Sequence, residues 1–243
     1  MTAGVGIIAA GEVHRRQPYP AVQTIYADEH YAARAMKVQT LSRRPESPTE
    51  KRQAIEAAVL RAMDDLLGEG AMYATLSVER IARRAGISRT AFYFYFADKR
   101  ELLMRLVAKL SEELYREADA WWSGAGDGPE QLTTALRKIA ALYRAHGPLV
   151  CAIVELSTYD EVVGPFWHAL VSRFMDASAG RIASEVAAGR ATSPAPEATA
   201  FALVWMTERT LHQMLVQDGV SDDELVHALA AIWVATVYCR GGA

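Results

Sequence analysis

Residues 85–103, AGISRTAFYFYFADKRELL, place five consecutive aromatic side chains among basic and hydroxyl-bearing neighbours. A helix turns by about 100° per residue, so five consecutive side chains cannot all face one core. Phe92 and Phe96 are four residues apart and are expected in the core. The hydroxyls of Tyr93 and Tyr95 can reach phosphates, and Phe94 can contact a sugar or a thymine methyl group. These residue types indicate nucleic-acid binding rather than catalysis.

Two short helices are expected to hold these side chains. Ser77 is expected to cap the first helix, Gly86 ends it, Ser88 is expected to cap the second helix, and Asp98 caps the one that follows. Such a pair is a helix-turn-helix, whose second helix lies in the DNA major groove with its N-terminal residues toward the base edges. Arg89 is the side chain best shaped for a bidentate bond to guanine, and a phosphate contact is the alternative.

The rest of the chain predicts helices throughout. Apolar residues recur at helical spacing from Pro48, and the alternation typical of strands is absent. Breaks at Gly and Pro divide the later part into helices at 129–146, 148–158, 162–188, 196–218 and 221–240. We expect an all-α fold of about nine helices, with a three-helix DNA-binding domain over 49–97 and a larger helical domain over 98–243.

Residues 1–48 are rich in Pro, Arg and Ser and have no sustained periodicity. We expect a mostly disordered arm. Two explanations are open: Met36 is the natural start and residues 1–35 are not natural, or the arm is genuine and adds contacts to the DNA backbone. The arginines that would make those contacts are Arg15, Arg16, Arg43 and Arg44.

Composition is that of a globular protein, with 243 residues, 51% hydrophobic content and a formal net charge of −3. Cys151 and Cys239 lie far apart with no His beside them, which argues against a disulfide scaffold or a zinc site. No apolar run reaches transmembrane length, and the N-terminus lacks the pattern of a signal peptide. A cytoplasmic protein without membrane contact is expected.

Charge is uneven along the chain. Residues 41–100 hold eleven Lys and Arg against eight Asp and Glu, so they carry +3 and the remainder carries −6. Random fluctuation is one explanation. The other is a basic module that meets nucleic acid, joined to a larger acidic body.

The segment LSVERIARRAGISRTAFYFYFADKRELL resembles the N-terminal DNA-binding domain of the TetR family of bacterial repressors, over roughly residues 50–100. Two further pieces, MTERTL (206–211) and IWVATVY (232–238), resemble the C-terminal part of the mycobacterial ethionamide-resistance branch of that family. Together they extend the resemblance over most of residues 50–240, and residues 1–48 have no counterpart in it.

This resemblance implies roles position by position. Ser77 would contact a phosphate, Tyr93 and Tyr95 would hold phosphates, and Lys99 would bind the DNA backbone from the start of the next helix. The groove-facing start of the recognition helix would consist of Ser88, Arg89, Thr90 and Ala91.

The last two helices are expected to form a homodimer. The resemblance implies a bundle made from two helices of each chain, and EATAFALVWMTERTLHQML is apolar nearly all round in its first half. Completion of a monomer core is the alternative. Glu208 and Arg209 interrupt this run, and we expect their charges to be paired or near the surface, in a structural role.

Aromatic residues predict a ligand pocket in the larger domain. In the ethionamide-resistance regulators, aromatic residues line an apolar channel; Trp167 and Trp233 match such positions and Phe174 stands where a Trp is found. Val204 and Thr207 replace two asparagines that offer polar contacts there, although Thr207 keeps a hydroxyl. These five residues are the predicted pocket for an elongated apolar ligand, with ordinary core packing as the alternative.

We therefore expect a ligand-responsive transcriptional regulator: a repressor that binds a palindromic operator as a dimer and is released by an apolar small molecule. Activation of transcription in place of repression is an alternative. The alternatives are a DNA-binding protein without sequence preference or effector and, less favoured, an all-α enzyme. The His and acidic residues have no acid–base or metal-ligand spacing, so no catalytic residue, metal or cofactor is predicted.

Overall fold

The computed structural model describes residues 50–124, 126–193, 195–217 and 219–238. Within these ranges the chain forms nine α-helices and one short 3₁₀ helix, and no strand. The predicted all-α fold of about nine helices is therefore confirmed. The arm expected over 1–48, with its arginines and Met36, lies outside the described residues.

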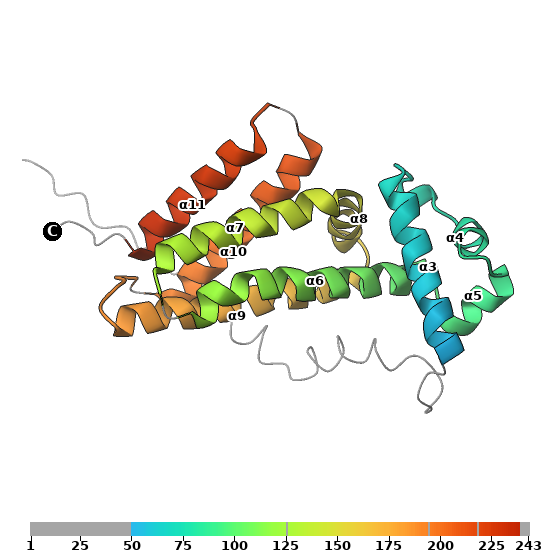
Figure 1. The fold of residues 1–243 in the computed structure, drawn as a ribbon, viewed down its shortest axis with the longest axis horizontal. Helices are drawn as coiled ribbons and strands as arrows, with labels where there is room; N and C mark the ends of the chain where they lie inside the picture. The colour runs from blue at the N-terminus through green and yellow to red at the C-terminus, as the bar shows by residue number, and fades with distance from the viewer. Residues whose placement is uncertain (1–49, 125, 194, 218, 239–243) are drawn as a thin grey trace, which may run out of the picture.

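The first helices form a small unit at one end of the molecule (Figure 1). This N-terminal unit consists of α3 (Glu50–Gly68), the 3₁₀ helix η2 (Tyr73–Thr75), α4 (Val78–Arg84) and α5 (Arg89–Tyr95). α4 packs against both α3 and α5. Ser77 and Ser88 cap α4 and α5 as predicted, so the expected helix-turn-helix is present.

The remaining helices form an elongated body. Its elements are α6 (Lys99–Ser123), α7 (Gly128–Ala145), α8 (Gly147–Ser157), α9 (Val163–Ala187), α10 (Pro196–Val216) and α11 (Asp222–Tyr238). Helices α7 to α11 each begin and end within two residues of the bounds expected from the Gly and Pro breaks. α6 starts beside the N-terminal unit and runs along the body, where it packs against α7, α8 and α9 (Figure 1).

The hydrophobic core is continuous between the two parts. Phe92 and Phe96 of the N-terminal unit belong to the same buried cluster as Leu102 and Leu103 of α6 and Ile153 of α8. The packing under α5 is therefore continuous with the packing around the start of α6. The predicted domain boundary between residues 97 and 98 therefore stays a prediction.

Among the described residues, no single helix is long and apolar enough to cross a membrane. Helices α7 and α8, which meet at 87°, reach that length and composition only as a bent pair.

Candidate functional site

The turn between α4 and α5 is fixed by local hydrogen bonds and by one glycine. The Oγ of Ser77 accepts from the N–H of Arg80 at 3.2 Å, and the Oγ of Ser88 accepts from the N–H of Ala91 at 3.0 Å. Gly86 has a φ of +71°, in the left-handed region that glycine adopts at little cost. The start of α5 is therefore held at a fixed angle to α4.

Helix α5 has one buried and one exposed face. Phe92 and Phe96 are 0% and 1% exposed, which confirms that they belong to the core, whereas Tyr93 and Phe94 are 47% and 59% exposed. The predicted contact residues Ser77, Ser88, Arg89 and Thr90 are also exposed, and Ala91 and Tyr95 are partly buried. Tyr93 and Phe94 therefore lie on the solvent-facing side of α5, as Arg89 and Thr90 do at its start.

Two cations lie against the tyrosines of α5. The guanidinium of Arg89 lies 5.9 Å from the ring centre of Tyr93, at the exposed start of the helix. The guanidinium of Arg52, on α3, lies 5.7 Å from the ring of Tyr95. Tyr95 therefore packs against α3, while Arg89 and Tyr93 are directed outward together.

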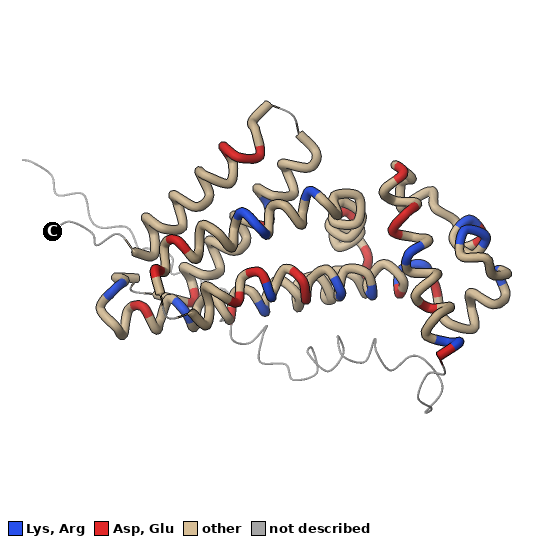
Figure 2. Tube along the Cα trace, in the orientation of Figure 1, with Lys and Arg blue, Asp and Glu red and all other residues tan. Residues whose placement is uncertain are grey.

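Arginines concentrate on α4, where Figure 2 shows several blue positions on one short helix. Arg84 donates to both carboxylate oxygens of Glu69, at 2.8 and 2.7 Å, so its charge is paired at the surface. Arg80 and Arg83 are exposed.

Lys99 lies at the start of α6, as expected, and contacts the N-terminal unit from there. Its ammonium donates to the carbonyl oxygens of Tyr73, Ala74 and Leu76, at 2.9, 3.2 and 3.2 Å. It also lies 4.5 Å from the Tyr73 ring centre, and burial lowers the pKa of Lys99. An ammonium has three donors, and all three are used to hold η2, so in this conformation Lys99 has no donor left for a phosphate.

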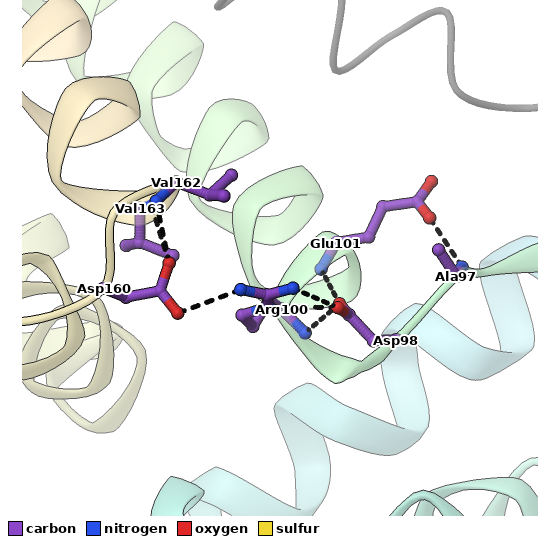
Figure 3. A network of polar contacts seen from close by, with 7 residues as sticks. All are labelled: Ala97, Asp98, Arg100, Glu101, Asp160, Val162 and Val163. Atoms are coloured by element: carbon purple, nitrogen blue, oxygen red, sulfur yellow. Dashed lines mark hydrogen bonds and ion pairs between the residues drawn. The ribbon is translucent and has the colours of Figure 1, made fainter.

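The start of α6 is tied to the body by a charged network (Figure 3). Arg100 donates to Asp98 at 2.8 Å and to Asp160, in the α8–α9 connection, at 3.1 Å. Asp160 also accepts from the N–H groups of Val162 and Val163, at 2.9 and 3.0 Å. Burial opposes ionisation of Asp160, but these bonds outweigh it and hold the pKa of its carboxyl below the ordinary range. One side chain of α6 therefore links the α5–α6 corner to the start of α9.

Asp98 itself forms the corner. As predicted it caps α6, where its Oδ1 accepts from the N–H groups of Arg100 and Glu101. Glu101 in turn accepts from the N–H of Ala97 at 2.7 Å. Side chains thus bond the N–H groups of Ala97, Arg100 and Glu101 at this corner.

The body encloses a cavity with a largely apolar wall. All five predicted pocket residues, Trp167, Phe174, Val204, Thr207 and Trp233, lie around it. Trp121 and Trp122 join them, whereas Phe201 is 44% exposed on the outer surface. The space free of protein atoms is about 900 Å³, including the part open to solvent. The lining comes from α6 to α11, so the whole body shapes it.

Most polar groups of this wall are bonded within the protein. Thr207 donates to the carbonyl of Leu203 at 2.8 Å and accepts from the indole N–H of Trp233 at 2.7 Å. The hydroxyl of Ser178 accepts from the indole N–H of Trp122 at 3.3 Å. The hydroxyl of Thr207, the expected substitute for the missing asparagines, is therefore already engaged.

Arg209 and Glu208 form the expected ion pair only at long range, and Glu208 is not near the surface. Its side chain is 4% exposed, lies in the cavity wall, and has no hydrogen-bond partner among the described residues for either oxygen. Arg209 is 56% exposed and its Nε lies 3.9 Å away, too far for a hydrogen bond. Burial raises the pKa of Glu208, and the weaker attraction of Arg209 opposes this. Spacing could have located it, because Val204 is four residues earlier on the same helix face.

No group of three or more His, Cys, Asp or Glu side chains in the described part of the chain is arranged to hold a metal ion. The two candidate functional features are thus the exposed face of α5 at one end of the molecule and the apolar cavity in the body.

Two separate parts of the chain match known protein families. Residues 61–106 match the family described as "Bacterial regulatory proteins, tetR family", and residues 132–239 match "Transcriptional regulator EthR, C-terminal domain". The HTH-type transcriptional regulator EthR of Mycolicibacterium smegmatis is 31% identical over 191 residues, which cover 75% of this chain and 86% of that protein. The chain belongs to the TetR family.

A second EthR sequence and a solved structure are also similar to this chain. EthR of Mycobacterium tuberculosis is 28% identical over 193 residues, which cover 75% of this chain and 87% of that protein. SmeT, the repressor of the Stenotrophomonas maltophilia multidrug efflux pump SmeDEF, has the same fold, with a TM-score of 0.62 over 77% of this chain and 91% of SmeT at 18% identity. The protein is a DNA-binding transcriptional regulator with a TetR helix-turn-helix and an EthR-type body.

Proposed function

We propose that this regulator is a repressor that binds a palindromic operator as a homodimer and is released when an apolar small molecule enters the cavity. The observation that carries the proposal is the course of α6. Its first residues hold η2 and the α5–α6 corner, and Val107, Leu110 and Leu114 further along line the cavity. A ligand that displaces α6 therefore acts on the orientation of α5.

The exposed face of α5 supports sequence-specific contact with DNA. Arg89 and Thr90 lie at its N-terminus, where a recognition helix meets base edges, and Tyr93 and Phe94 follow one turn later. In this proposal Arg89 reads a guanine, and the hydroxyls of Ser77, Ser88, Tyr93 and Tyr95 bind phosphates. Lys99 acts indirectly, because it holds η2 beside α4.

The outer faces of α10 and α11 support dimer formation. Phe201 on α10 and Ile232 on α11 are 44% and 46% exposed. Beyond its acidic start, α11 carries no Lys, Arg, Asp or Glu, and Figure 2 shows it without charge along that length. Unpaired apolar faces of this kind are typical of subunit contacts. A two-fold dimer would present two α5 helices to half-sites about one helical turn apart.

Membership of the family supports the repressor sign and action in the cytoplasm. SmeT, which shares the fold, is the repressor of an efflux pump, and this supports repression as the sign here. A regulator of bacterial genes acts on DNA in the cytoplasm. We assign no catalytic reaction to the protein.

The DNA-binding half of the proposal is tested by fluorescence anisotropy with labelled DNA from upstream of the protein's own gene and scrambled DNA of equal length. Wild type, Arg89→Ala and Arg137→Ala are compared over a salt series. Arg137 is the matched control, since it is an exposed arginine on α7 in the body.

The expected result is saturable binding that prefers the upstream DNA, weakened about 5- to 100-fold by Arg89→Ala and unchanged by Arg137→Ala. Equal affinity for the upstream and the scrambled DNA, with the same salt dependence for both, would favour a DNA-binding protein without sequence preference.

A further inference from the structure

The cavity wall contains one charged group whose ion-pair partner, the exposed Arg209, lies 3.9 Å away, beyond hydrogen-bond distance. Glu208 lies in the wall, is 4% exposed, and neither of its carboxylate oxygens accepts a hydrogen bond from the described residues. A buried carboxylate is costly unless it is paired or protonated. Its position facing a cavity means that a ligand can supply the missing hydrogen-bond donors.

A second buried carboxylate, Glu185, is paired by arginines and provides a comparison for Glu208. Glu185, on α9, is 1% exposed; it accepts from Arg190 at 2.8 and 3.1 Å and lies 2.9 Å from Arg181. These arginines hold the pKa of Glu185 below its ordinary range, whereas burial raises the pKa of Glu208. The two carboxylates therefore differ in kind, and only Glu208 faces the cavity.

Glu208 is the one charged side chain among the residues that line the cavity. The aromatic wall of Trp121 and Trp122 belongs to the far end of α6. From Val107 to Trp122 the lining follows α6 over roughly 22 Å at 1.5 Å per residue, so a long apolar wall accompanies this single carboxylate.

We propose that the effector is a cationic amphiphile, with a protonated amine that binds the Glu208 carboxylate and an apolar chain or ring system that lies along the aromatic wall. An ammonium supplies both the opposite charge and up to three N–H donors to the two oxygens. This inference rests on the proposed function, because it names the ligand class of the same cavity.

The test uses three probes of equal chain length and different head groups: decylamine, 1-decanol and decanoate, each below its micelle concentration at pH 7.5. Their dissociation constants are measured by titration calorimetry and by thermal shift, with full-length wild type, Glu208→Gln and Glu197→Gln. Glu197→Gln makes the same charge change at an exposed position on the same helix.

We expect wild type and Glu197→Gln to bind decylamine at least about tenfold more tightly than 1-decanol, as for a charge-assisted hydrogen bond, and decanoate most weakly. Glu208→Gln should lose the preference for the amine and gain affinity for decanoate. If 1-decanol binds wild type as tightly as decylamine does, or if Glu208→Gln keeps the preference, the amine assignment is wrong while the apolar cavity stands. If no probe binds to wild type, both the ligand class and the cavity's proposed role are wrong.

Discussion

Glu208 links the burial of one carboxylate to the pH dependence of stability. Because its folded pKa is raised, the folded state keeps this proton to a higher pH than the unfolded chain does. Stability is therefore lost as pH rises from the ordinary Glu value of about 4.3 through the raised pKa, and the loss is complete above it.

Glu208→Gln removes this pH-dependent loss of stability, because a glutamine does not ionise. We expect the variant to be more stable than wild type by about 1–3 kcal/mol at pH 8, and the difference to shrink as pH falls toward 5. Urea unfolding at both pH values measures it, with Glu197→Gln as the control. A difference that is absent at pH 8, or that grows on acidification, would show that Glu208 is paired in solution.

Lys99 gives a second prediction at the residue scale, because its bonds decide between two roles. Its three carbonyl contacts predict that Lys99→Met lowers the free energy of unfolding by about 1–2 kcal/mol and leaves the salt dependence of DNA binding unchanged. A direct phosphate contact would instead reduce the slope of log K against log salt concentration by about 0.9. Lys109→Met, at an exposed position of the same helix, is the control for both measurements.

At the scale of elements, the α4–α5 turn depends on Gly86. Its φ of +71° is strained for a residue with a Cβ, although no atom lies within 4 Å of the Cβ position. Gly86→Ala should therefore destabilise the protein by about 1–2 kcal/mol, measured by urea unfolding.

Gly180, exposed within α9, provides the opposite case. It also has open space around the Cβ position but no left-handed φ, so Gly180→Ala should stabilise by about 0.5–1 kcal/mol. Equal effects of the two substitutions would mean that the turn relaxes without strain.

The helices themselves were predictable because their boundaries are local. Ser77, Ser88 and Asp98 each bond N–H groups two or three residues ahead, so residue type and spacing are enough to place these caps. The burial of Phe92 and Phe96 follows in the same way from helical spacing. The gathering of the five pocket residues came from the family resemblance, since core packing and cavity lining share one pattern.

The position of a charge was not predictable where its partner is distant in sequence. The ammonium of Lys99 donates to carbonyl oxygens more than twenty residues earlier, in and just after η2. No pattern in the sequence predicts η2. The spacing from Val204 gives the face of Glu208, but it does not reveal that Arg209 points to solvent. Such outcomes depend on tertiary packing, which decides whether a buried charge has a neighbour.

For the whole molecule, the exposed apolar faces of α10 and α11 predict a dimer that one charge can disrupt. Ile232→Glu would bury a carboxylate in that contact, which should weaken association by at least about 2 kcal/mol. Sedimentation equilibrium measures the change in dissociation constant. Val162→Glu is the control, because Val162 is 43% exposed in the α8–α9 connection. Loss of the dimer in both variants, or in neither, would contradict this placement.

The network at Arg100 predicts how the body and the N-terminal unit communicate. Asp160→Asn keeps the oxygen that accepts from Val162 and Val163 but removes the charge that binds Arg100. We expect little change in stability, because Arg100 is 42% exposed, and a smaller effect of bound ligand on DNA affinity. The ratio of the DNA dissociation constants with and without decylamine measures this coupling. An unchanged ratio would show that α6 transmits the signal without this network.

The coupling between the cavity and α5 is tested most directly by two readouts on one sample. The protein is bound to the DNA it selects from a random pool and is titrated with decylamine and, separately, with 1-decanol. Thermal stabilisation of the protein reports occupancy of the cavity, and anisotropy of the labelled DNA reports release. We predict that DNA is released over the same probe concentrations that fill the cavity. A cavity filled to saturation while the DNA stays bound would contradict ligand control of this regulator.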